Sequence, residues 1–159
     1  MKNYYELVDA NKFKSNLVIF GFVAFITVSA YFIGYALGYG LDFVGFALIF
    51  SGLASFASYY YSDRIVLSLS SAKPAKRSDH FDYYTVTENL SHVARIPMPA
   101  LYVIEDTAMN AFATGRDPKH AALVATTGIL AKLNRTELEG VIGHELSHVK
   151  NYDIRLMGI

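Results

Sequence analysis

The sequence predicts an α+β fold in which a two-helix transmembrane hairpin precedes a small domain built from a short sheet and one long helix. Two uncharged, mostly apolar runs near the N-terminus predict the hairpin. Three short β-prone segments separated by turns predict the sheet. A helical pattern from Asn134 to Asp153, which contains His144-Glu145-Leu146-Ser147-His148, predicts the long helix.

The hairpin is predicted from length and the absence of charge. Leu17–Leu37 and Phe43–Tyr61 contain no charged residue, and each run is long enough to cross a hydrocarbon core of about 30 Å as a helix. We therefore assign residues 1–16 to an N-terminal segment and residues 17–62 to the hairpin. The alternative is a buried pair of soluble helices, which two adjacent runs of this length disfavour.

The basic residues predict the orientation of the hairpin. They flank it on both sides, whereas the connection 38–42 contains none. The positive-inside rule then places residues 1–16, and the domain that follows the hairpin, on the cytoplasmic side of a cytoplasmic (inner) membrane, with a multi-pass topology. The flanking basic residues are Lys2, Lys12, Lys14, Arg64, Lys73, Lys76 and Arg77.

The overall composition excludes some classes of site and partner. The 159 residues include no cysteine, so neither a disulfide framework nor a thiolate metal site is possible. The formal net charge is zero, which gives no reason to expect a nucleic-acid partner. The lipid bilayer is the one partner that composition predicts, and the oligomeric state stays open.

The second half of the chain is predicted to be a separate domain. Residues 63–80 are polar and basic with Ser and Pro, which is typical of a juxtamembrane linker. Residues 82–95 have apolar residues at helical spacing, and Pro97 ends that pattern. The three candidate strands are Ala100–Glu105, Asn110–Thr114 and Ala121–Thr126.

The His144–His148 segment has the residue types and spacing of a hydrolytic zinc site. Two histidines about one turn apart share a helix face, and Glu145 projects roughly 100° around the axis from His144. Neutral imidazoles leave the zinc charge intact, so the ion can polarise a carbonyl and lower the pKa of water to about 7. Glu145 is then the natural general base for peptide hydrolysis. The alternative is a non-enzymatic membrane adaptor in which the motif is incidental.

The residues around this motif resemble a known family. Three segments in order after a membrane hairpin, Asn110–Gly115, Thr127–Leu130 and Leu138–Asn151, are similar to those of the HtpX-like membrane zinc metalloproteases. The resemblance implies a zincin-like metalloprotease domain over residues 81–159 and one Zn²⁺ per complete protein. It also implies protein substrates, namely misfolded or damaged membrane proteins in quality control and the stress response. A selective processing protease is an alternative that the sequence does not exclude.

The resemblance also implies roles for individual residues. His144 and His148 correspond to zinc ligands and Glu145 to the catalytic base. The strand with the Asn-Ala-Phe-Ala pattern borders the cleft in this family, so Asn110, Ala111, Phe112 and Ala113 become candidates for contact with the substrate backbone. Sheet packing is the alternative role, particularly for Phe112.

The third zinc ligand of the family has no counterpart that can be assigned in this sequence. In the family it is a glutamate on a later helix. Asp153 lies nine positions after His144 and would point about 180° away on a continuous helix, which makes it a poor substitute. We therefore expect the domain to be truncated at the C-terminus, and we expect the 159-residue chain alone to show little proteolysis.

Overall fold

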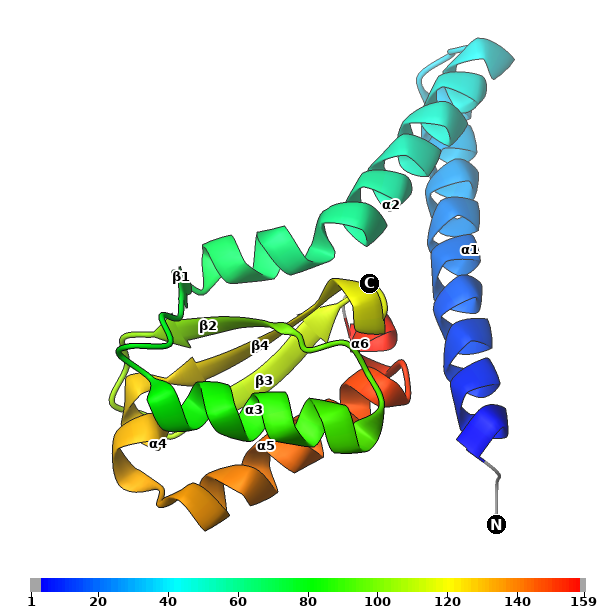
Figure 1. Cartoon of the computed structure of the whole chain (residues 1–159). Helices are drawn as coiled ribbons and strands as arrows, with labels where there is room; N and C mark the ends of the chain where they lie inside the picture. The colour runs from blue at the N-terminus through cyan, green and yellow to red at the C-terminus, as the bar shows by residue number, and fades with distance from the viewer. Residues whose placement is uncertain (1–3, 158–159) are drawn as a thin grey trace.

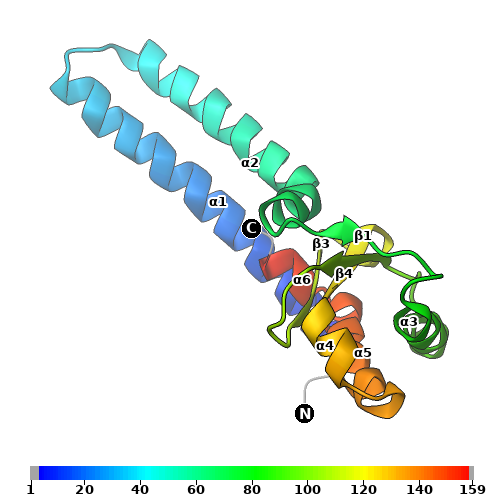
Figure 2. The same ribbon diagram turned by 90° about the vertical axis from the view of Figure 1, so that its left-hand side faces the viewer.

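The computed structural model describes residues 4–157 and begins with two long antiparallel helices. Helix α1 spans Tyr4–Ala36 and helix α2 spans Leu41–Leu69. Both are long and apolar enough to cross a membrane. Large apolar side chains such as Phe20, Phe25 and Phe50 are exposed along them, as expected for side chains that face lipid. Figures 1 and 2 show this hairpin projecting away from the remainder of the chain.

Both helices extend beyond the apolar runs that predicted them. Helix α1 already begins at Tyr4, so the described part of the predicted segment 1–16 is helical, whereas residues 1–3 lie outside the described residues. Helix α2 continues past the predicted end of the hairpin at residue 62 to Leu69. Residues 62–69 contain neither Gly nor Pro, so nothing in the backbone ends the helix when the apolar run ends.

The predicted linker at 63–80 is only partly irregular. Its first residues form the end of α2, and Lys73–Pro74 form a short strand, β1, that pairs antiparallel with β2. The Ala75 backbone N–H continues this pairing by donating to the Leu101 carbonyl (2.9 Å). Part of the predicted linker is therefore regular, because sheet pairing holds a segment that has no strand pattern of its own.

A four-stranded mixed sheet forms the centre of the domain. Its strand order is β1-β2-β4-β3, with β2 (Ala100–Ile104) parallel to β4 (Ala121–Thr126) and β3 (Ala111–Gly115) antiparallel to β4. These bounds confirm the three predicted strands to within one residue at each end. Strand β3 lies at the edge of the sheet, which leaves one side of its backbone without a strand partner among the described residues.

Strand β4 is buried on both faces. Leu123 packs into the main core with helices α3 (Phe81–Ala94) and α5 (Arg135–Lys150), which lie together on one face of the sheet (Figure 1). Val124 points the other way and packs with Leu67 near the end of α2. The short helix η1 (Pro118–His120) precedes β4, and the helices α4 (Thr127–Lys132) and α6 (Asp153–Met157) complete the domain.

Helix α3 is joined to the sheet by a buried tyrosine. The predicted helix over residues 82–95 is confirmed as Phe81–Ala94, ending at Arg95 in the left-handed region. The Tyr83 hydroxyl donates to the Leu123 carbonyl of β4 (2.9 Å). Burial, followed by repulsion from Tyr84, raises the pKa of Tyr83 well above its usual value, so this phenol stays protonated.

Candidate active site

Helix α5 presents the His144–His148 segment and begins where the sequence predicts. The Asn134 side chain accepts from the Glu137 N–H (3.0 Å), and the Glu137 carboxylate accepts from the Asn134 N–H (2.9 Å), which together form a capping box. Leu138, Ile142 and Leu146 bury one face of the helix against the sheet. The opposite face leaves His144 exposed and His148 half-buried.

The two histidine side chains converge on one point. Their Nε2 atoms lie 3.2 Å apart, and their rings meet edge to face with centroids 4.7 Å apart. Two nitrogen ligands that each lie about 2.0–2.1 Å from a tetrahedral zinc stand about 3.3–3.4 Å from each other. The observed separation therefore fits a shared zinc ion with little movement of either ring.

Glu145 lies against the edge strand β3. Its Oε2 atom accepts a hydrogen bond from the Ala113 N–H (3.1 Å). The Asn110 carbonyl accepts from the Thr126 N–H (3.0 Å), and because pairing directions alternate along a strand, the polar backbone groups of Ala111 and Ala113 face away from β4. The carboxylate is thus held at the free edge of the sheet, beside the histidine pair.

Asp153 contacts His148 instead of pointing away from it. Its Oδ2 atom lies 2.8 Å from His148 Nδ1. The prediction of a continuous helix to Asp153 is wrong, because α5 ends at Lys150 and Tyr152 takes a positive φ of 62°, which turns the chain back. A carboxylate on Nδ1 favours the tautomer that leaves Nε2 available to a metal.

Asp153 is itself held by the first helix. The Asn11 side-chain amide of α1 donates to Asp153 Oδ1 and to the Asn151 carbonyl (3.1 Å for the latter). Nearby, the Lys12 ammonium lies 4.4 Å from the centroid of the Tyr152 ring. A chain of contacts therefore runs from the membrane hairpin through one carboxylate to a predicted zinc ligand.

Known proteins that resemble this chain are peptidases. Residues 81–159 match peptidase family M48. A protease HtpX homolog of Streptococcus mutans is 45% identical over 160 residues, which covers 98% of this chain and 52% of the relative. Homologs from Streptococcus thermophilus and Streptococcus uberis are 40% and 39% identical, with the same coverage. The chain is an HtpX-like member of peptidase family M48. It spans about half the length of these relatives.

Two glycines in the segments that resemble the family, Gly115 and Gly128, lie where a side chain would not fit. A Cβ atom at Gly128 would lie 2.3 Å from the Thr107 carbonyl oxygen, because the loop that follows β2 crosses directly over this residue. A Cβ atom at Gly115 would lie 2.3 Å from the His120 carbonyl oxygen, and Gly115 also has a φ of 133°. Both glycines therefore allow close approach of the backbone, Gly115 beside the start of β4 and Gly128 beneath the loop that follows β2.

The remaining predicted site residues have different positions in the HtpX-like chain. Ala113 contacts Glu145 through its backbone, and Phe112 packs on the far face of the sheet with the cluster around Val124. Among residues 4–157, no group of three His, Cys, Asp or Glu side chains is arranged to hold a metal. The sequence did not predict the contact of Asn11 with Asp153, because no local pattern indicates it. It also did not predict the contact of Asp153 with His148, which a helix end at Lys150 would have suggested.

The Asp153 contact predicts a measurable effect on metal binding. Asp153→Asn is expected to weaken zinc binding by the purified chain about 10–100-fold, because outer partners of this kind orient the ligand and raise its basicity. Asn11→Ala is expected to weaken zinc binding less, because Asn11 contacts Asp153 and not His148 itself. Competition with a chromophoric chelator measures both affinities. Asp79→Asn, which alters an exposed carboxylate before α3, is the control.

Proposed function

We propose that the protein carrying this sequence is a membrane-anchored zinc endopeptidase. The observation that carries the proposal is the convergence of His144 Nε2 and His148 Nε2 (3.2 Å) beside the Glu145 carboxylate at the edge of the sheet. His144 and His148 would hold the ion, which supplies a Lewis acid for the scissile carbonyl and acidifies water. The relatives are named as proteases, which supports the same reading.

Glu145 has the position of a general base. As water attacks the peptide carbonyl, Glu145 takes one proton from that water and later delivers it to the departing amine. The hydrogen bond from the Ala113 N–H holds Oε2 toward β3, so the carboxylate has a defined direction before substrate arrives. Asp153 orients His148 in a similar way, because its carboxylate accepts the Nδ1 proton of the imidazole.

The edge strand β3 is the proposed docking place for the substrate backbone. The outward-facing groups of Ala111 and the Ala113 carbonyl can pair with an extended peptide, as in strand addition to a sheet edge. Such pairing would lay the peptide alongside Glu145, which already contacts the same strand. Asn110 and Phe112 would then keep the strand in register, because Asn110 bonds Thr126 and Phe112 packs on the far face.

We further propose a role in removing misfolded or damaged membrane proteins. The domain packs directly on the hairpin, so a site on it stays close to the bilayer surface. The basic residues that flank the hairpin favour the cytoplasmic side. A selective processing protease would use the same catalytic groups and differ in its substrate contacts.

Removal of the metal tests the proposal. The natural polypeptide that carries this sequence is expected to contain one zinc ion per molecule and to cleave an unfolded protein such as casein. Chelation by 1,10-phenanthroline should abolish cleavage, and added Zn²⁺ should restore it. Elemental analysis and gel-based cleavage measure the two properties. A fully functional protein isolated without metal would contradict the proposal and favour a membrane adaptor.

A further inference from the structure

A cavity of about 540 Å³ lies where the domain meets helix α2 at Tyr59. We call it the basic cavity, because its lining residues include five cations and one carboxylate, Asp117. The catalytic segment His144–His148 is not among its lining residues. The five cations are Arg95, Arg116, Lys119, Lys150 and Arg155.

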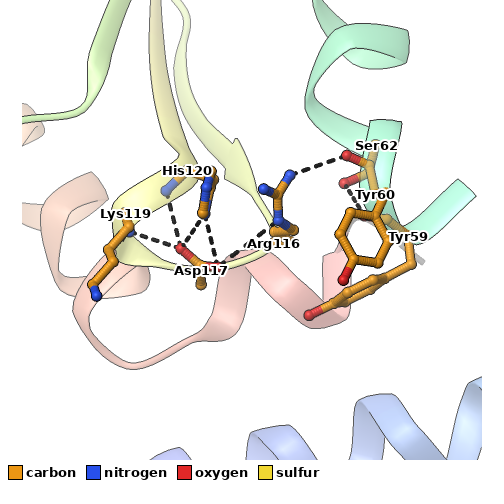
Figure 3. Close-up of polar contacts among 7 residues, drawn as sticks. All are labelled: Tyr59, Tyr60, Ser62, Arg116, Asp117, Lys119 and His120. Carbon is orange, nitrogen blue, oxygen red and sulfur yellow. Dashed lines mark hydrogen bonds and ion pairs between the residues drawn. The ribbon is translucent and has the colours of Figure 1, made fainter. Parts of the chain in front are cut away.

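The one carboxylate in the lining is already engaged by its own turn. Asp117 Oδ1 accepts from the Lys119 N–H (2.8 Å) and the His120 N–H (3.0 Å), and it lies 2.8 Å from His120 Nδ1. Figure 3 shows these contacts within the turn that follows β3. Burial raises the pKa of Asp117, but the hydrogen bonds from His120 and Lys119 outweigh it and lower the pKa overall. Asp117 therefore makes only a long contact, 3.9 Å, with Arg116 Nε.

Neutral groups hold two of the arginines in place. Arg116 Nη1 donates to the Tyr60 carbonyl (3.1 Å), and the guanidinium lies 5.1 Å from the centroid of the Tyr60 ring (Figure 3). Arg155 Nη2 donates to Asn16 Oδ1 (2.8 Å), and its guanidinium lies 5.2 Å from the centroid of the Tyr59 ring. Neutral partners fix both side chains without cancelling their charge. The Arg155 Nε atom is buried and has no hydrogen-bond partner among the described residues.

Three other basic residues of the domain have carboxylate partners. Lys73 pairs with Glu105 (2.9 Å), and Arg77 pairs with Glu88 (3.2 Å). Arg135 contacts both Asp82 and Glu139, at 2.7 Å and 3.6 Å. The lining of the basic cavity therefore carries more cations than carboxylates, even when Lys150 is left out of the count. It calls for an anion from outside the described chain.

The position of the cavity identifies the source of that anion. Tyr59 and Tyr60 stand at the end of the apolar run Phe43–Tyr61, where an interfacial aromatic belt is expected. The two arginines that pack on these rings therefore lie at headgroup depth. Guanidinium groups bind phosphate oxygens through paired hydrogen bonds, and basic pockets beside membrane helices bind anionic headgroups. We propose that the basic cavity binds the phosphate group of an anionic phospholipid.

Lipid retention by the purified 159-residue chain tests this inference without any reference to proteolysis. The chain is reconstituted in nanodiscs of equal parts phosphatidylglycerol and phosphatidylcholine, released into detergent, and analysed by native mass spectrometry for bound lipid. A second arm uses nanodiscs of phosphatidylcholine alone and measures binding of inorganic phosphate by calorimetry. The second arm separates a headgroup from a free phosphate ion.

The wild-type chain is expected to retain phosphatidylglycerol in preference to phosphatidylcholine. The double substitution Arg95→Gln/Lys119→Gln should reduce this retention about tenfold or more, because each cation near an anionic surface contributes substantially to binding. Both side chains are exposed, so the fold should be unaffected. The control Lys73→Gln/Arg77→Gln removes the same charge from paired positions and should leave retention unchanged. A second variant, Arg116→Gln/Arg155→Gln, should reduce retention at least as strongly.

Three results would overturn the inference. The first is equal retention of the two lipids by the wild-type chain. The second is an equal loss in the control variant, which would indicate general electrostatic attraction to the bilayer. The third is phosphate binding in phosphatidylcholine nanodiscs that is as tight as lipid binding, because the ligand would then be a soluble anion.

Discussion

Replacing Glu145 by glutamine is expected to lower the rate of peptide cleavage about 10²–10⁴-fold in the natural polypeptide. Glutamine has nearly the same shape and can still accept from the Ala113 N–H, so the geometry at β3 is retained. What it lacks is a basic oxygen that can take a proton from water. Zinc content should stay at the wild-type level, because Glu145 is placed beside the histidine pair and is not a ligand. Cleavage rates and zinc content, measured on the same preparation, test both statements.

Glu139→Gln is the matched control for this substitution. Glu139 lies on the same helix, is exposed and pairs weakly with Arg135 (3.6 Å). Its replacement should change neither the cleavage rate nor the zinc content. Wild-type cleavage by the Glu145→Gln protein would remove Glu145 from the reaction. Loss of zinc from that protein would instead make Glu145 a ligand.

Replacing His148 by alanine is expected to weaken zinc binding more than 100-fold. An outer partner of a ligand is worth about 10–100-fold, and His148 is itself a proposed ligand, so the loss should exceed that range. The substitution also leaves the Asp153 carboxylate without its imidazole partner. The purified chain can be used directly, because the measurement is a competition titration with a chelator and does not depend on catalysis.

His92→Ala is the control, because His92 is exposed near the end of α3 and belongs to no predicted site. The zinc affinity of the His92→Ala chain should equal that of the wild-type chain. Cobalt substitution gives a second readout, since the visible spectrum of Co²⁺ depends on its nitrogen ligands. Unchanged affinity and an unchanged cobalt spectrum in His148→Ala would contradict the shared site.

The long regular elements of the fold are predictable because each has its own local signal. Helix α5 has a capping box at Asn134, and strand β4 is a short apolar run between turn residues. Strand β1 has no such signal, since Lys73–Pro74 becomes a strand only by pairing with Tyr102 and Val103. The continuation of α2 to Leu69 is similar, because packing of Leu67 on the sheet stabilises a helix end that hydropathy does not predict.

The candidate site also contains features that the local sequence predicts and features that depend on tertiary contacts. The spacing of His144 and His148 determines that their side chains share a face, and the structure brings their Nε2 atoms to 3.2 Å. The Glu145 contact with Ala113 depends on how β3 lies against α5, and the Asn11 contact joins residues 142 positions apart. Neither contact can be predicted from the pattern of a single segment, because each joins residues that are far apart in the sequence.

The bond from Asn11 to Asp153 has a practical consequence for anyone who wishes to crystallise the domain by itself. Deleting the hairpin to gain solubility would remove the amide that steadies this carboxylate and would strip the apolar cover from the outer side of β4. Such a trimmed protein would report on a loosened metal pocket. Preparations intended for enzymology should keep the first helix from its beginning.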